Sequence, residues 1–294
     1  MLEVSGVTKI FKTGMFGREL TTAVSDVSFA VQPGEVISLI GESGSGKTTV
    51  GRMILRLTEP TAGAITFDGH DVASLGRREL RRYYAHVQGV FQDPFSSYNP
   101  VFKVDRVLGM IHSSYLRDLS ASEWKTKLQK SLEAVSLEPA DVLGKYPHQL
   151  SGGQLQRLMI ARALLLELQF LVADEIISML DASTRIDVLN LLGDLKARGV
   201  GILFITHDLS LGNYISDRTL ILRRGRVVEM GATEKVYGNP AHPYTQMLLT
   251  SVPHLTERWD PTAQVPTPTP ADEDGDAPLV KVADDHFAAI RGAT

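Results

Sequence analysis

"VISLIGESGSGKTTVGRMIL", residues 36–55, decides the fold, because it joins a strand to a helix through a loop of glycine and serine. Its first residues are mainly apolar and indicate a strand, whereas Val50 and Ile54 recur at helical spacing. Between them, residues 41–48 match G-x-x-x-x-G-K-[ST], the pattern of a phosphate-binding loop. A chance Gly- and Ser-rich turn is the alternative, but the flanking strand and helix favour the functional interpretation. The sequence therefore predicts an α/β nucleotide-binding core.

The residue types in this loop suit a magnesium nucleotide. Glycines let consecutive backbone N–H groups wrap around phosphates, and the N-terminus of the following helix adds partial positive charge. Lys47 is expected to reach the β- and γ-phosphates, and Thr48 to offer its hydroxyl to Mg²⁺. The candidate nucleotide-binding residues of the loop are Gly41, Ser43, Gly44, Ser45, Gly46, Lys47, Thr48 and Thr49.

Two acidic residues end the apolar run "FLVADE" at residues 170–175. A second apolar run, residues 201–206, follows a helix-like segment, so both runs are expected as buried strands of a parallel sheet with crossover helices. Asp174 is the candidate for the Mg²⁺ shell, and Glu175 is placed to accept a proton from the water that attacks the γ-phosphate. Alone, two acids at a strand end would more often be an exposed loop pair. With the phosphate loop, they indicate nucleotide hydrolysis.

The folded part of the chain is expected to span residues 2–253. Residues 2–40 contain alternating apolar positions that predict an N-terminal antiparallel β subdomain. From about residue 95 to 165 the sequence becomes helical in character, so a helical subdomain is expected there. Within it, Ser120 and Glu123 have the spacing of a capping box, which marks the start of a helix.

Residues 254–294 are expected to form a C-terminal extension. From residue 259 to 278 the composition turns to Pro, Thr, Asp and Glu, which cannot bury a core and predicts a disordered linker. The last segment, "LVKVADDHFAAIR" at residues 279–291, leaves two alternatives open: it docks back on the fold, or it stays loose.

Composition excludes several classes of protein. The 294 residues carry a formal net charge of −4, so there is no overall attraction to nucleic acid and no nucleic-acid partner is expected. The basic cluster at residues 77–84 is interpreted as a solvated helix face. Because there is no cysteine, disulfides, zinc–thiolate sites and cysteine-ligated iron–sulfur clusters are excluded. No apolar stretch is long enough to span a bilayer and the N-terminus lacks a signal pattern, so the chain is not expected to cross a membrane itself.

A second Ser-Gly-Gly loop runs into a helix at "LSGGQLQRLMIARALL", residues 150–165. With Gln92 in "VFQDP", Asp181 in "SMLD" and His207 in "FITHD", the chain resembles the ATP-hydrolysing subunit of ATP-binding-cassette (ABC) transporters over about residues 2–253. In that family these segments are the signature loop, the glutamine loop, the D-loop and the switch histidine. The resemblance therefore implies a RecA-like P-loop NTPase core, ATP and Mg²⁺ as ligands, and ATP hydrolysis coupled to transport.

The same resemblance implies a reason why one chain carries two phosphate-binding loops. In this family two subunits pair head to tail, and the signature loop of each caps the γ-phosphate bound to the other subunit's phosphate loop. The N-terminus of the signature helix would supply the donors and the partial positive charge. The residues assigned to nucleotide binding in this way are Ser151, Gly152, Gly153, Gln154 and Asp181.

The resemblance also implies the catalytic assignments. Gln92 would sense the γ-phosphate and join Thr48 and Asp174 around the metal, while His207 would contact the γ-phosphate. The catalytic candidates are thus Glu175, His207 and Gln92, and the metal candidates are Thr48, Gln92 and Asp174. Phe11 is the candidate for stacking on adenine, with Phe16 as the alternative.

Three segments are most similar to the ATPases of oligopeptide and dipeptide importers, whose relatives also move nickel and oligosaccharides. They are "GESGSGKTT" at residues 41–49, "VFQDPFSSYNP" at 90–100 and "NPAHPYTQMLLTSVP" at 239–253. This similarity implies a second ATPase subunit, identical or paralogous, two transmembrane permease subunits, and an extracytoplasmic solute-binding protein that acts indirectly. It also implies a peripheral location on the cytoplasmic face of the cell membrane.

The sequence departs from this family at two places. Some relatives end in a cysteine-rich segment, which this chain lacks. Where Pro-Thr usually follows the catalytic glutamate, the chain has Ile176-Ile177, and the loss of proline frees the backbone beside Glu175.

Two other functions remain as alternatives. A cassette ATPase of DNA repair or translation would usually carry a second cassette or a long coiled coil, and the chain has neither a second P-loop nor a sustained heptad repeat. A regulatory cassette that binds ATP but hydrolyses it weakly is disfavoured by Glu175, His207 and the intact signature loop, whereas Ile176-Ile177 leaves it open.

Overall fold

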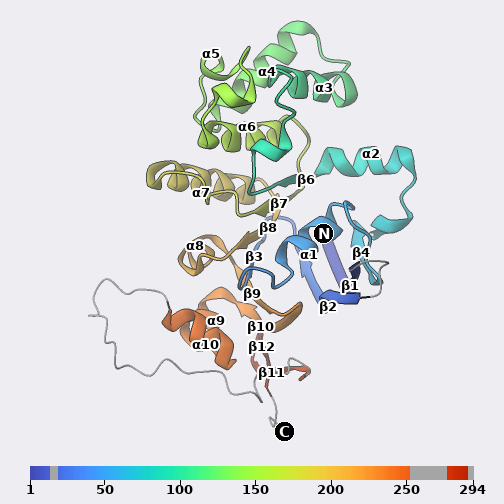
Figure 1. Cartoon of the computed structure of the whole chain (residues 1–294), viewed down its shortest axis with the longest axis vertical. Helices are drawn as coiled ribbons and strands as arrows, with labels where there is room; N and C mark the ends of the chain where they lie inside the picture. The colour runs from blue at the N-terminus through green and yellow to red at the C-terminus, as the bar shows by residue number, and fades with distance from the viewer. Residues whose placement is uncertain (14–18, 252–276, 291–294) are drawn as a thin grey trace. The chain divides into compact units, whose positions relative to one another are not determined.

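The computed structural model describes residues 1–13, 19–251 and 277–290. The chain folds into two compact units (Figure 1): the first combines residues 1–74 with residues 203–294, and the second is residues 75–202. The first unit is therefore built from both ends of the chain.

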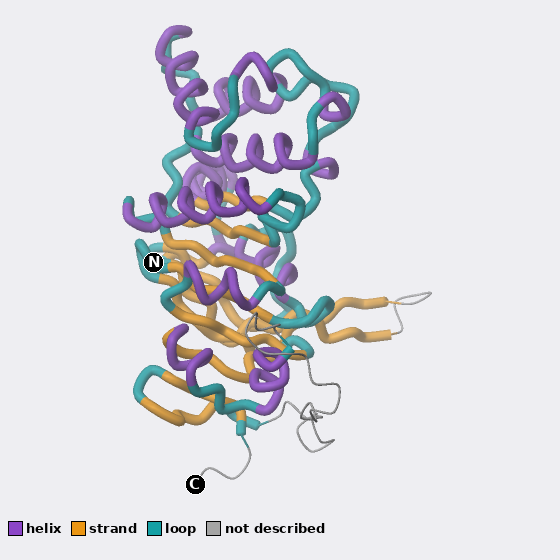
Figure 2. Tube along the Cα trace, turned by 90° about the vertical axis from the view of Figure 1, so that its left-hand side faces the viewer, coloured by secondary structure: helices purple, strands orange, loops and turns teal. Residues whose placement is uncertain are grey.

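The N-terminal part of the first unit is an antiparallel sheet, as expected. Its strands lie in the order β2-β1-β4-β5, and Leu2 of β1 pairs with Val31 on one side and Phe67 on the other. The distal parts of β1 and β2 project together as a two-stranded arm (Figure 2). The strands are β1 (Leu2–Thr13), β2 (Glu19–Val31), β4 (Ala62–Phe67) and β5 (His70–Asp71).

The other sheet of the first unit carries the strand predicted before the phosphate loop. Its strands lie in the order β11-β12-β10-β9-β3-β8, with β3 parallel to β9 and the β9–β10, β10–β12 and β11–β12 pairs antiparallel. These strands are β3 (Val36–Ile40), β8 (Gly201–Thr206), β9 (Arg218–Arg223), β10 (Arg226–Ala232), β11 (Leu279–Ala283) and β12 (His286–Ala289). Every residue of β3 is buried, which explains the apolar run that identified it.

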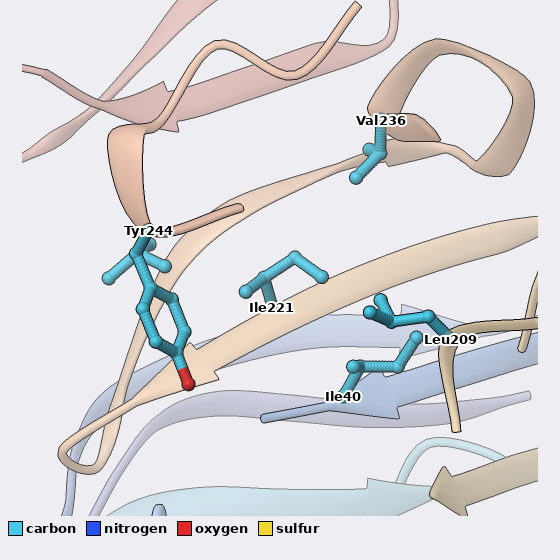
Figure 3. Close-up of a cluster of buried hydrophobic side chains, with 6 residues drawn as sticks. Ile40, Leu209, Ile221, Val236 and Tyr244 are labelled. Carbon is cyan, nitrogen blue, oxygen red and sulfur yellow. The ribbon is translucent and has the colours of Figure 1, made fainter. Parts of the chain in front are cut away.

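Four helices accompany these strands in the described part of the first unit: α1 (Lys47–Ile54), α8 (Leu209–Ile215), α9 (Thr233–Gly238) and α10 (Pro243–Thr250). A buried cluster unites three helices with three strands, and Figure 3 shows most of it. Because burying one such side chain stabilises a fold by about 1.5–3 kcal/mol, this cluster fixes the position of the C-terminal helices. Its members are Ile40, Leu209, Ile221, Val228, Val236 and Tyr244.

The second unit contains the predicted helical segment and two parallel strands. Val87 of β6 pairs with Phe170 of β7. The capping box predicted for Ser120 and Glu123 is present: the Ser120 hydroxyl accepts the Glu123 N–H, and the Glu123 carboxylate accepts the Ser120 N–H. The elements are α2 (Arg77–His86), β6 (Val87–Val90), α3 (Asp105–Tyr115), α4 (Ala121–Glu133), α5 (Pro139–Val142), α6 (Gly152–Leu164), β7 (Phe170–Asp174) and α7 (Ala182–Ala197).

Of the two alternatives for the last segment, the structure shows docking. Strands β11 and β12 form a hairpin, and β12 pairs with β10 of the first unit through Met230 opposite Phe287. Most of the segment expected as a linker lies outside the described residues. Among the helices that the structure describes, none combines the length and apolarity needed to cross a bilayer.

Candidate nucleotide-binding site

The phosphate loop lies between β3 and α1, and its conformation requires glycine. Gly46 has a φ of 105°, and a Cβ there would come within 2.4 Å of the Ala23 carbonyl oxygen. A Cβ on Gly41 would lie 2.1 Å from the carbonyl oxygen of Leu222. Both approaches are far shorter than a van der Waals contact. The glycines of the motif therefore allow the loop to fold tightly against β9 and β2.

Lys47 is buried, and its ammonium group lies across the loop. Its Nζ donates hydrogen bonds to the carbonyl oxygens of Gly41 and Glu42, each at 2.7 Å. A buried ammonium held in this way provides a fixed positive charge inside the loop. Thr48 and Thr49 follow in the first turn of α1, and both are half-buried. The arrangement can neutralise phosphate oxygens, with the N-terminus of α1 adding its dipole.

Neighbouring segments of the first unit hold the loop in place. The N–H of Ser45 donates to the Glu42 carbonyl at 3.1 Å, and the N–H of Gly225 donates to the Ser45 carbonyl at 2.9 Å. The N–H of Glu42 donates to the Tyr244 hydroxyl at 3.2 Å. Gly225 lies in the β9–β10 turn and Tyr244 in α10, so the C-terminal half of the chain supports a loop near the N-terminus.

His207 follows β8 in the same unit, and its side chain is exposed. The next residue, Asp208, caps α8 by accepting the N–H groups of Ser210 and Leu211. Phe11 lies on β1 with its side chain exposed, and the Lys9 ammonium lies over its ring, 5.2 Å from the centroid. Phe16, the alternative for stacking, lies outside the described residues.

In the second unit, Asp174 ends β7 as a buried carboxylate and Glu175 follows it in the left-handed region, with a φ of 51°. That conformation is unfavourable for a residue with a Cβ, so the surrounding structure has to maintain it. Ile176 and Ile177 are both buried. The Glu175 carbonyl accepts hydrogen bonds from the N–H and the hydroxyl of Ser178. The two buried isoleucines and the Ser178 hydrogen bonds thus hold the segment that follows Glu175.

The donor set suits Mg²⁺ by its chemistry. Thr48 and Gln92 offer neutral oxygens and Asp174 a carboxylate, and Mg²⁺ in nucleotide sites typically uses one or two such protein ligands together with phosphate oxygens. Within the described ranges, no three His, Cys, Asp or Glu side chains gather as a metal site of their own.

The glutamine loop and the signature helix are joined within the second unit. Gln92 is exposed immediately after β6. The side chain of Gln156, on α6, donates to the carbonyl of Phe91 at 3.2 Å, and Arg162 donates to the carbonyl of Gly89 at 3.1 Å. The residues that lead into the glutamine loop are therefore bonded to the helix that follows the signature loop.

The signature loop has a helix cap that the sequence analysis missed. The Ser151 hydroxyl accepts the Gln154 N–H at 3.1 Å, and the Gln154 side-chain oxygen accepts the Ser151 N–H at 3.0 Å. This capping box was detectable from the Ser-x-x-Gln spacing. Gly152 and Gly153 occupy the first turn of α6, where N–H groups have no partner within the helix. Gln154 consequently helps to position the loop.

Asp181 also caps a helix. Its carboxylate accepts hydrogen bonds from the backbone N–H of Thr184 at 2.9 Å, the Ser183 hydroxyl at 2.7 Å and the Thr184 hydroxyl at 3.1 Å. These bonds, with the Thr184 N–H as the largest contribution, lower the pKa of Asp181 to about 2. The carboxylate is therefore ionised at neutral pH at the N-terminus of α7, where negative charge is favourable.

We expect Asp181→Ala to lower the melting temperature at neutral pH and to have less effect in acid. The folded-state pKa of about 2 lies below the ordinary value of 3.8, so this carboxylate contributes stability that is fully present above pH 3.8 and is lost as the pH falls towards 2. Melting curves recorded from about pH 7 down to about pH 3 test this. An Asp181→Ala difference that stays constant across the range would contradict it.

The predicted residues thus lie in both units. The first holds the phosphate loop, Phe11 and His207. The second holds Gln92, the signature loop, Asp174, Glu175 and Asp181.

Comparisons with known proteins identify the family. Residues 24–178 match the family described as ABC transporter, so the chain belongs to the ABC transporter family of ATP-binding proteins. Residues 228–276 match the family described as oligopeptide/dipeptide transporter, C-terminal region. Both matches confirm the resemblance seen in the sequence, and the chain is an ATP-binding ATPase of the ABC type.

Among curated relatives, the dipeptide transport ATP-binding protein DppF of Lactococcus lactis subsp. cremoris is 40% identical and the alignment covers 90% of this chain and 88% of DppF. The oligopeptide transport ATP-binding protein AppF of Bacillus subtilis is also 40% identical, over 88% of this chain and 80% of AppF. A Brucella ovis protein provisionally named as a peptide import ATP-binding protein is 45% identical, over 91% of this chain and 85% of its own.

Among solved structures, a dimeric post-hydrolysis state of the ATP-binding cassette MJ0796 bound to ADP and Pi is similar in fold. Its TM-score is 0.71 at 28% sequence identity, covering 79% of this chain and 99% of that chain. This likeness confirms the predicted fold class of a nucleotide-binding cassette.

Proposed function

We propose that this ATPase powers the import of oligopeptides or dipeptides through partner membrane subunits. One observation carries the proposal: a closely packed phosphate loop with Lys47 fixed inside it occurs in a chain whose relatives are named for peptide and dipeptide transport. Nickel and oligosaccharides are the alternative solutes.

Each site residue has a task in this proposal. Lys47 and the N-terminus of α1 neutralise the phosphates, and His207 contacts the γ-phosphate. Glu175 accepts a proton from the attacking water. Bound Mg²⁺ would neutralise charge on the β- and γ-phosphates, held by Thr48, Gln92 and Asp174. The described residues supply all of these groups.

The signature loop supports a dimeric assembly. Ser151 and the first N–H groups of α6 form an anion-binding terminus on the second unit, whereas Lys47 belongs to the first. In a head-to-tail dimer, the signature loop of one subunit completes the site of the other. The partner is a second ATPase subunit, and the assembly binds two permease subunits at the cytoplasmic face of the membrane and receives solute from an extracytoplasmic binding protein.

Reconstitution of the complex with its permease subunits in lipid vesicles tests the transported solute. We expect ATP-dependent uptake of a labelled oligopeptide, competed by dipeptides, and none with Lys47→Ala in place of the wild-type subunit. Uptake of nickel or an oligosaccharide without peptide uptake would replace the peptide assignment by one of the alternatives.

Aromatic residues after the glutamine loop are candidates for docking a permease subunit. Phe95 is 48% exposed and Phe102 is 37% exposed, whereas Tyr98 is only 4% exposed. Phe95 also lies next to the signature loop, because a Cβ on Gly152 would come 3.8 Å from its ring. The two phenylalanines thus present apolar surface beside the nucleotide-sensing loops, while Tyr98 belongs to the core.

We expect Phe95→Ala or Phe102→Ala to preserve the melting temperature and ADP binding of the isolated subunit while lowering transport by the assembled complex about tenfold or more, an effect typical of an interface hot spot. Tyr98→Ala is the contrasting variant and should lower the melting temperature, because it opens a cavity in the core. If both phenylalanine variants transport normally, the docking surface lies elsewhere.

A further inference from the structure

The C-terminal hairpin is anchored to β10 of the first unit by a buried hydrogen bond. His286 of β12 and Glu229 of β10 are 2% and 0% exposed, and the His286 Nε2 lies 2.7 Å from a Glu229 carboxylate oxygen. The hairpin packs closely here, since a Cβ on Gly231 would come 2.5 Å from the Asp285 carbonyl oxygen. The N–H of Ala232 donates to the same carbonyl at 3.1 Å. Glu229 is therefore enclosed by the hairpin.

The Glu229 carboxylate also holds the turn that leads into α10. Its two oxygens accept the N–H groups of Ala241 at 2.8 Å and His242 at 3.0 Å. His242 in turn caps α10, because its Nδ1 accepts the N–H of Tyr244 at 3.0 Å. A buried carboxylate with three donors is well satisfied, and the loss of any donor would loosen the turn.

Tyr244 extends from this turn to the phosphate loop. Its ring is buried in the cluster with Ile40 and Ile221 (Figure 3), and the Arg223 guanidinium lies 4.8 Å from the ring centroid. Its hydroxyl accepts the N–H of Glu42, the second residue of the loop, at 3.2 Å. Burial raises the pKa of this hydroxyl, which keeps it protonated.

The backbone N–H and the carbonyl of Glu42 are thus both hydrogen-bonded. Its N–H is bonded to Tyr244, and its carbonyl accepts hydrogen bonds from Lys47 and from the N–H of Ser45. A loop that binds phosphate gains affinity when its donors are already oriented before the ligand arrives. The Tyr244 hydroxyl and the Lys47 ammonium therefore hold the same peptide segment of the loop, through the N–H and the carbonyl of Glu42.

We propose that Tyr244 is a positioning residue for the phosphate loop, and that the C-terminal hairpin controls nucleotide affinity through it, by way of Glu229 and His242. The inference rests on the proposed role of residues 41–49 in nucleotide binding. It assigns a function to a C-terminal segment that carries no motif of the ATPase itself.

Calorimetric titration of the full-length chain with ADP tests the first step. ADP is chosen because it lacks the γ-phosphate, so contacts from His207 or from a partner's signature loop do not contribute. We expect Tyr244→Phe to weaken ADP binding about three- to tenfold, the range for losing one hydrogen bond while the ring is kept.

The control is Tyr237→Phe. Tyr237 packs against the same cluster, but its hydroxyl donates to the Leu209 carbonyl. It should bind ADP like the wild type. Equal affinities for Tyr244→Phe and the wild type would overturn the proposal.

A second set of variants tests the connection to the hairpin. His286→Leu removes the donor to Glu229, and we expect it to weaken ADP binding by about the same factor as Tyr244→Phe. Lys281→Ala, which breaks only an exposed pair with Asp284 on the same hairpin, should have no effect. If the hairpin acts through Tyr244, adding His286→Leu to Tyr244→Phe should weaken binding little further. Effects that multiply, or unchanged affinity in a folded His286→Leu chain, would overturn this link.

Two further variants distinguish a failure of the present inference from a failure of the phosphate-loop assignment. If His286→Leu does not fold, Glu229→Gln tests the same link, because the amide has one acceptor oxygen in place of two, and wild-type affinity would contradict the inference. Lys47→Ala tests the underlying assignment. If Lys47→Ala leaves ADP binding intact, the phosphate-loop assignment fails. If Lys47→Ala loses binding but Tyr244→Phe does not, only the present inference fails.

Discussion

Replacing Lys47 by alanine is expected to reduce ATP hydrolysis to background and to weaken ATP and ADP binding about 100-fold or more, a loss typical of a charge-assisted contact that has no substitute. The ammonium is buried in the loop and fixed by two carbonyl oxygens at 2.7 Å, so no neighbouring side chain can take its position without rearranging the loop. Steady-state phosphate release and calorimetric titration measure the two effects.

The control for this variant is Lys125→Ala, which removes an exposed lysine from α4 and should hydrolyse ATP normally. Lys47→Ala also leaves the carbonyls of Gly41 and Glu42 without one donor each, so its melting temperature has to be recorded alongside. Near-normal turnover in a folded Lys47→Ala chain would remove the basis for placing the nucleotide at residues 41–49.

Replacing Glu175 by glutamine is expected to preserve ATP binding, to lower hydrolysis about 100-fold or more, and to leave an ATP-bound dimer that does not separate. Glutamine has the shape of glutamate but cannot accept a proton from water, while every phosphate contact remains. Size-exclusion chromatography with light scattering, in ATP and in ADP, reports the dimer. Glu167→Gln, at an exposed position before β7, is the matched control and should behave as the wild type.

This experiment also decides whether the chain is a weakly hydrolysing regulatory cassette. Glu175 has a left-handed φ of 51°, and it is followed by the buried Ile176 and Ile177. We therefore expect the wild-type subunit to turn over ATP and to separate after hydrolysis. If wild type and Glu175→Gln hydrolyse equally slowly, Glu175 does not act as the base and the regulatory alternative is favoured.

The parts of the fold that depend on local sequence were predictable. The strand, loop and helix around residues 36–55 follow from neighbouring residues, and so does the cap of α4 at Ser120. Both depend on interactions within a few positions of the chain, where periodicity and capping rules apply. The family motifs added Asp174 and His207, whose strands were visible as apolar runs.

Interactions between distant segments were not predictable. The bond between Tyr244 and Glu42 joins residues 202 positions apart, and the pair of His286 with Glu229 spans 57. No periodicity encodes such partners, because they result from the order of strands in the sheet. The sequence also did not predict the C-terminal hairpin as such. Its two strands are short, and they are stabilised by pairing with β10, which is distant in the sequence.

The arrangement of the first unit from the two ends of the chain has a consequence for synthesis on the ribosome. Strand β3 pairs with β9, and the N–H of Val36 bonds to Asp217, 181 residues later. At roughly 5–20 residues per second, the ribosome needs about 10–40 s to make that intervening chain. Until β8 and β9 are made, the apolar residues of β3 have no neighbouring strand to pair with. Newly made chains therefore expose an aggregation-prone strand during this interval, and a slow codon between residues 75 and 202 would lengthen it.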